Sequence, residues 1–133
     1  MTSNHQVGPE TAWVGLSQLY PDMRFGQLIE MVAVLAGEES PEKAFDIDDT
    51  KLFQTALCHL STRWRQLGKE TTILAGSLPP IRLDLIRLLP ELQKRYLGWR
   101  FGQLVSNVAG WSGVSLYDAE DEQLLIAARQ HLV

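Results

Sequence analysis

Two acidic clusters, each followed ten residues later by a histidine, are the side chains of this sequence with the clearest capacity for chemistry. The first cluster is Asp46, Asp48 and Asp49, followed by His59; the second is Asp118, Glu120 and Asp121, followed by His131. Carboxylates and imidazoles bind metal ions and transfer protons. The clusters lack the spaced oxygen ligands and the central glycine of a calcium loop, so we predict no metal site from them.

Electrostatics at helix starts explain the same acidic residues. Asp46 and Asp118 are each predicted to cap the start of a helix. Asp49 and Asp121 follow three residues later, as a short-armed form of the capping box. On this interpretation the clusters stabilise structure and bind nothing.

The histidines and the single cysteine have structural explanations as well. His59 and His131 would lie late in their helices, where a partly positive imidazole suits the helix dipole. The other hypothesis is that they meet across a twofold axis and bind a metal or titrate together, and the sequence leaves their role open. Cys58 excludes an internal disulfide because it is the only cysteine, and we interpret it as a small residue on a helix.

Known catalytic motifs are absent from the sequence. It contains no nucleophile elbow, phosphate loop or zinc-protease helix motif. We therefore predict no catalytic residue, no metal and no cofactor. An enzyme or metal-binding protein of unrecognised type stays as an alternative.

The acidic clusters belong to a longer internal repeat. The pentapeptide Arg24–Leu28 recurs unchanged as Arg100–Leu104, and eight of the fourteen residues that begin at each arginine are identical, where average composition predicts about one. Further along the chain, 45–60 aligns with 117–132. The chain is thus predicted to be a duplicated unit whose two copies have diverged.

Hydrophobic spacing predicts helices in both copies. Pro9 to Tyr20 is a short helix with proline in its first turn, and Ile81 to Leu97 is helical around Pro90, which kinks one helix or begins a second. The next helix of each copy has apolar residues at intervals of three and four, which form one stripe. The two apolar stripes are Phe25, Leu28, Val32 and Leu35 in the first copy and Phe101, Leu104, Val108 and Trp111 in the second.

Glycines are expected to end the striped helices, and the acidic clusters are expected to begin the last helix of each copy. Gly37 and Gly113 lie where a left-handed residue closes a helix. The last helix runs to about Gly68 in the first copy and to the C-terminus in the second.

Repeated polar and glycine residues at the start of the striped helices are predicted to fix these helices against their neighbours, with the arginine locking the second helix of a copy to the third. Gly26 and Gly102 suggest that another helix crosses closely there. An arginine at a helix start needs compensation, which an acidic cluster or an external anionic partner would supply. Gln27 and Gln103 would complete this polar network or cap a nearby chain end. The motif residues are Arg24, Gly26, Gln27, Asp49, Arg100, Gly102, Gln103 and Asp121.

Charge is unevenly distributed along the chain, which carries a net charge of -4. Residues 63–100 hold eight basic and three acidic side chains between two acidic flanks. The alternation of these charges with leucines is typical of an amphipathic helix with a solvated rim, and a nucleic-acid-binding surface is the alternative. The basic residues proposed for that alternative are Arg63, Arg65, Lys69, Arg82, Arg87, Lys94 and Arg95.

The repeated pattern resembles a group of small, uncharacterised bacterial and phage-associated proteins. In that pattern Arg-Phe-Gly-Gln-Leu is followed by an aromatic residue, an Asp, an acidic pair and a leucine. The likeness covers roughly 24–60 and 100–132 and includes Leu52, Asn107 and Leu124; the first copy departs from it at Met31, where the second has Asn107. The resemblance implies a bacterial origin and carries no mechanism.

Together these observations predict an all-α fold in which two three-helix repeats pack about a pseudo-twofold axis. Residues 1–133 form one domain, with repeat 1 at about 9–68, a connector at about 69–80 and repeat 2 at about 81–133. We predict a cytoplasmic, non-catalytic protein-interaction module of the accessory or immunity type, without a membrane segment. Its expected partner is another protein, and Trp13, Trp64 and Trp99 are the candidate surface anchors.

Overall fold

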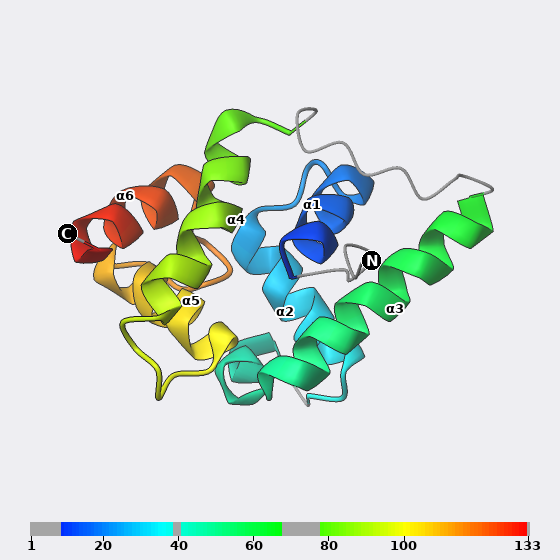
Figure 1. The fold of residues 1–133 in the computed structure, drawn as a ribbon, viewed down its shortest axis with the longest axis horizontal. Helices are drawn as coiled ribbons and strands as arrows, with labels where there is room; N and C mark the ends of the chain where they lie inside the picture. Colours follow the sequence, from blue (N-terminus) through cyan, green and yellow to red (C-terminus); the bar gives the residue numbers. More distant parts are fainter. Residues whose placement is uncertain (1–8, 39–40, 68–77, 133) are drawn as a thin grey trace, which may run out of the picture.

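Helices make up the regular structure of the chain in a computed structural model, which describes residues 9–38, 41–67 and 78–132 (Figure 1). Within these ranges there is no strand, so the all-α prediction is confirmed. No described helix has both the length and the apolar content needed to cross a membrane. The elements are α1 (Pro9–Leu19), α2 (Phe25–Leu35), the 3-10 helix η2 (Pro41–Asp46), α3 (Asp49–Leu67), α4 (Pro80–Gln93), α5 (Phe101–Trp111) and α6 (Asp121–Leu132).

The helices form two groups along the chain. In Figure 1, α1, α2 and α3 lie on one side, and α4, α5 and α6 lie on the other. α1 packs against α3, and α4 packs against α6. η2 packs against both α2 and α5 and so bridges the two groups. Pro90 lies inside α4 without starting a second helix, and α4 ends at Gln93, earlier than the predicted Leu97.

The striped helices α2 and α5 end in the same way. Gly37 and Gly113 have φ angles of 108° and 80°, in the left-handed region that favours glycine, as predicted. The residue after each glycine donates its N–H back into the last turn: Glu38 to the Ala33 carbonyl at 3.1 Å and Val114 to the Ala109 carbonyl at 3.2 Å. This is the Schellman arrangement.

Gly26 and Gly102 allow close approach, by a turn at Gly26, where a helix was predicted, and by the short 3-10 helix η2 at Gly102. A Cβ at Gly26 would collide with the backbone carbonyl of Leu116, in the turn that precedes α6. A Cβ at Gly102 would collide with the backbone carbonyl of Ala44, in η2. Each striped helix therefore packs against the segment that leads into the last helix of the other group.

The centre of the core is aromatic and is built by three helices. Trp13 of α1 lies between Phe25 of α2 and Phe101 of α5, with ring centroids 5.8 Å away in both cases. Phe25 and Phe101 also meet edge to face at 6.4 Å. The two apolar stripes thus converge in one interior, except at their ends, where Leu35 is 50% exposed and Trp111 is half-buried.

Candidate functional site

Asp121 is the centre of a polar junction that joins α6 to α2 and α4. Its Oδ1 accepts the N–H of Phe25 at 2.9 Å, and its Oδ2 accepts Nε of Arg82 at 2.5 Å. The guanidinium of Arg82 also donates to Ser17 Oγ at 2.8 Å and to the Met23 carbonyl at 2.5 Å. One carboxylate thus satisfies a helix N-terminus and the charge of an arginine that is buried in the protein.

Asp49 forms a corresponding junction whose described partners are neutral. Its Oδ1 accepts the N–H of Phe101 at 2.6 Å, and its Oδ2 accepts Nε2 of Gln93 at 2.9 Å. The same amide group of Gln93 donates to the Trp99 carbonyl at 3.4 Å. Gln93 therefore links the aspartate to the chain ahead of α5, as Arg82 does ahead of α2.

Arg82 and Gln93 were not recognised as junction residues from the sequence. Arg82 lies outside the aligned part of the repeat and looked like one more basic residue of the central segment. Gln93 aligns with Ser17, a residue of different size and chemistry. No local pattern marks either residue, because their partners are distant in the chain.

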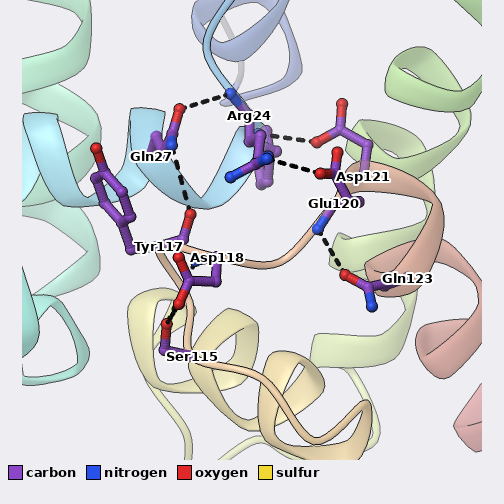
Figure 2. Close-up of polar contacts among 9 residues, drawn as sticks. Arg24, Gln27, Ser115, Tyr117, Asp118, Glu120, Asp121 and Gln123 are labelled. Atoms are coloured by element: carbon purple, nitrogen blue, oxygen red, sulfur yellow. Dashed lines mark hydrogen bonds and ion pairs between the residues drawn. The ribbon is translucent and has the colours of Figure 1, made fainter.

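Arg24 and Arg100 contact the acidic segment of the opposite group. Nη2 of Arg24 lies 2.7 Å from Oε2 of Glu120 (Figure 2), and Nη1 of Arg100 donates to the backbone carbonyl of Asp46. Arg24 thus pairs with a carboxylate of an acidic cluster, but this cluster precedes α6 and not α3, the helix to which the arginine was predicted to lock α2. The side chains of Arg24 and Glu120 are 38% and 58% exposed, so the pair contributes little stability.

Gln27 caps α2, whereas Gln103 has no corresponding role. Oε1 of Gln27 accepts the N–H of Arg24 at 3.1 Å, and its Nε2 reaches the Tyr117 carbonyl at 3.5 Å (Figure 2). The side chain of Gln103 makes no hydrogen bond with any residue that the structure describes. The repeated glutamines are therefore not equivalent in their contacts.

The predicted caps of the last helices are wrong by two residues. α3 begins at Asp49 and α6 at Asp121, so the residues in the capping position are Asp48 and Glu120. Oδ2 of Asp48 accepts the N–H of Lys51 at 3.3 Å, as a capping side chain does. Asp46 instead ends η2. Because another residue caps the helix, the carboxylate of Asp49 is available to reach α5.

Two of the three candidate tryptophan anchors belong to the core. Trp13 and Trp64 are 3% and 6% exposed, which corrects their interpretation as surface residues. Trp99 is half-buried and stacks on Tyr96 at 4.3 Å. The rings of Trp13 and Trp64 fill the interior. The sequence pattern does not distinguish a tryptophan of the core from one that binds a partner at the surface.

The two histidines have different surroundings and do not meet. Nε2 of His59 lies 2.7 Å from Oη of Tyr20, whereas His131 stacks on Trp111 at 3.6 Å. Burial lowers the pKa of His59 below its ordinary value of 6.5, and the positive charge of Arg63 lowers it further. Across the described residues no three His, Cys, Asp or Glu side chains are grouped to hold a metal ion.

The central basic residues do not form one described surface. Arg82 is buried at the Asp121 junction, Arg87 pairs with Glu10 at 3.3 Å, and Lys94 pairs with Glu91 at 3.2 Å. Arg63 and Arg65 lie near the far end of α3, well apart from α4 in Figure 1, and Arg95 follows α4. Lys69 lies outside the described residues.

A groove beside α2 gathers exposed apolar side chains that no sequence pattern marked as a surface site. Val34, Leu35 and Tyr117 are 42%, 50% and 56% exposed. Figure 2 shows the ring of Tyr117 beside α2, where its backbone carbonyl accepts the hydrogen bond from Gln27. The α2 groove has a volume of about 420 Å³ and is lined by Met23, Gln27, Glu30, Met31, Val34, Leu35 and Tyr117.

The polar junctions and the α2 groove differ in what they can do. The junction groups are engaged with one another, so they hold helices in place. The α2 groove presents apolar surface and flexible methionines, which suit the binding of another molecule. Comparisons of the chain with protein-family models, with curated proteins and with solved structures give no match.

Proposed function

We propose that the chain consists of two three-helix units related by an approximate twofold axis. Reciprocal contacts support this arrangement: Asp121 binds the N–H of Phe25, and Asp49 binds the N–H of Phe101. The contact between Phe25 and Phe101, which align in the sequence repeat, would lie near the axis. In an experimental structure, α2 and α3 should superpose on α5 and α6 by a rotation close to a half-turn, and a poor superposition would reject the axis.

We further propose that the protein is a non-catalytic interaction module that binds another protein through the α2 groove. Its role would be that of an accessory or immunity-type protein, which acts by occupying its partner. The observation that carries this proposal is the gathering of three exposed apolar residues, Val34, Leu35 and Tyr117, in one groove.

Comparison of the two sequence copies supports a binding role for the α2 groove. Met31 and Val34 align with Asn107 and Gly110 on α5. Gly110 is exposed, and a Cβ added there would meet nothing within 4 Å. In the other copy these two helix positions hold a polar residue and a glycine. The packing of the helix therefore does not require apolar side chains at either position.

Site-specific photo-crosslinking tests this proposal. A photoreactive amino acid replaces Val34 in the groove or, as a control, Ile126, which is 50% exposed on α6. In cells of the host that naturally makes the protein, we expect a cross-linked protein from position 34 and none from position 126. Equal products at both positions, a nucleic-acid product or no product at position 34 would contradict the proposal.

A further inference from the structure

We infer that a small cavity beside Asp49 binds the guanidinium group of a ligand. The cavity has a volume of about 100 Å³ and a largely apolar lining, to which α1, α3, α4 and α5 contribute. An apolar cavity of about 150 Å³ is enough to bind benzene, so this one has room for a small organic group. Among the residues that line it are Trp13, Asp49, Phe53, Gln93 and Phe101. None of its described lining residues belongs to the α2 groove, so the inference does not depend on the proposed function.

The lining of the cavity corresponds to the surroundings of Arg82 in the other junction. The guanidinium of Arg82 donates to Asp121 and to Ser17, and its Cζ lies 6.0 Å from the centroid of the Phe25 ring. In the sequence repeat, Asp121, Ser17 and Phe25 align with Asp49, Gln93 and Phe101. All three aligned residues line the cavity. The cavity therefore repeats the environment of a bound guanidinium.

The charge of that guanidinium has no counterpart among the residues that the structure describes at the cavity. Gln93 donates to the carboxylate of Asp49 and to a backbone carbonyl, as Arg82 does in its junction, but an amide brings no charge. Asp49 is the only charged side chain among the described residues that line the cavity. When the alignment is continued toward the N-terminus, the position of Arg82 falls on Gln6, which is also neutral. The positive charge is thus left for a ligand to supply.

A guanidinium suits this lining better than other small groups do. It is planar, forms charge-assisted hydrogen bonds with a carboxylate and stacks on aromatic rings, three of which line the cavity. It is also more weakly hydrated than an ammonium group, so it leaves water more readily. The carboxylate repels an anion, and a neutral molecule leaves its charge unpaired.

An NMR titration of the intact protein tests the inference. The probes are propylguanidine, which copies the end of an arginine side chain, propylurea, which has nearly the same shape without the charge, and the anion butyrate. The N–H of Phe101 and the side-chain amide of Gln93 both donate to Asp49, so their signals report on the cavity. We expect propylguanidine to shift both signals and to bind at least about tenfold more tightly than propylurea or butyrate. The N–H signal of Phe25 is the internal control, because its carboxylate partner is already paired with Arg82.

Two variants that remove the same charge from adjacent residues locate the binding. Asp49→Asn should weaken binding of propylguanidine by about tenfold or more. Asp48→Asn is the matched control: Asp48 is exposed and is not among the described residues that line the cavity, so binding should change less than about twofold. Circular dichroism of each variant confirms that its helices are retained.

Two peptides distinguish a free small molecule from an arginine of another protein as the source of the guanidinium. One is a pentapeptide with arginine between alanines, and the other has citrulline, which is neutral, in place of the arginine. If the arginine peptide binds more tightly than propylguanidine and the citrulline peptide binds more weakly, the source is a protein. If the arginine peptide binds no more tightly than propylguanidine, the ligand is a free small molecule.

Three results would overturn the inference. The first is equal binding of propylguanidine and propylurea, which would mean that the charge is not recognised. The second is that neither propylguanidine nor the arginine peptide binds. The third is equal weakening by Asp49→Asn and Asp48→Asn, which would place the bound cation outside the cavity.

Discussion

At the residue scale, the two aspartate junctions have the same layout but different electrostatics. Asp121 faces a buried guanidinium, while Asp49 faces a neutral amide. A buried charge is strongly unfavourable unless it is paired, so removal of one partner leaves a large penalty. A neutral hydrogen bond that is lost or rearranged has a smaller effect. The junctions therefore offer a matched comparison within one chain.

We predict that Asp121→Asn destabilises the protein more than Asp49→Asn. The first change leaves Arg82 buried without its counter-charge and should lower the free energy of unfolding by about 3–5 kcal/mol. The second keeps an oxygen for the N–H of Phe101 and should lower it by about 1 kcal/mol. Urea unfolding of both variants measures the difference, and equal losses would show that the charge of Arg82 is not the deciding factor.

His59 is predicted to make stability depend on pH. Its pKa is lowered in the folded protein by burial and by Arg63, so below pH of about 6.5 the unfolded chain binds a proton more readily than the folded one. The contribution of His59 is fully present above that pH and is lost as pH falls toward the lowered pKa. NMR titration of the imidazole should show the lowered pKa, and His59→Gln should reduce the loss of stability on acidification. A ring that titrates at or above 6.5 would contradict this prediction.

At the scale of elements, the N-termini of α2 and α5 are held by segments from the other group. The N–H of the first residue of each helix binds an aspartate, and the second residue is a glycine pressed against a backbone carbonyl. A backbone carbonyl cannot move aside as the end of a flexible side chain can. These helix starts are therefore sensitive to the addition of a single carbon atom.

We predict opposite effects for alanine at different helical glycines. Gly26→Ala and Gly102→Ala should lower the free energy of unfolding by about 1–3 kcal/mol, because the new Cβ forces the backbone contacts with Leu116 and Ala44 apart. Gly110→Ala on α5 meets nothing within 4 Å and should raise it by up to about 1 kcal/mol through helix propensity. Thermal unfolding of the three variants checks the signs. If Gly26→Ala stabilised the protein, the backbone carbonyl of Leu116 would have to lie farther from Gly26 than it does in this structure.

At the scale of the whole molecule, neither group of helices has a complete interior of its own. Trp13 and Phe25 of one group pack against Phe101 of the other, and each group supplies the aspartate that the other needs. Contacts of this kind make the folding of the two groups interdependent. The chain should unfold in a single cooperative transition despite its internal repeat.

A chain cut between Leu67 and Leu78 tests this interdependence. Each fragment alone is expected to have low helix content, and mixing the two should restore the circular dichroism spectrum of the intact protein. Asp121→Asn in the C-terminal fragment should weaken reassembly more than Asp49→Asn in the N-terminal fragment, because it leaves Arg82 unpaired. Two fragments that fold fully on their own would contradict the prediction.

Local patterns in the sequence were sufficient for the helices and for some of their ends. The apolar spacing from Phe25 and from Phe101 locates α2 and α5 because side chains three and four residues apart share one face of a helix. Gly37 and Gly113 mark the helix ends because a left-handed residue is needed there. These features depend on residues that are close together in the chain, so they can be predicted from the sequence.

Only the tertiary structure decided which distant residues meet. Asp49 and Asp121 look like capping residues of their own helices, yet their carboxylates bind the helices of the opposite group. Trp13 and Trp64 were candidates for the surface until packing placed them inside, and Val34, Leu35 and Tyr117 form a groove only when α2 meets the turn before α6. Such contacts join residues that no local pattern relates, because their partners are set by how the whole chain packs.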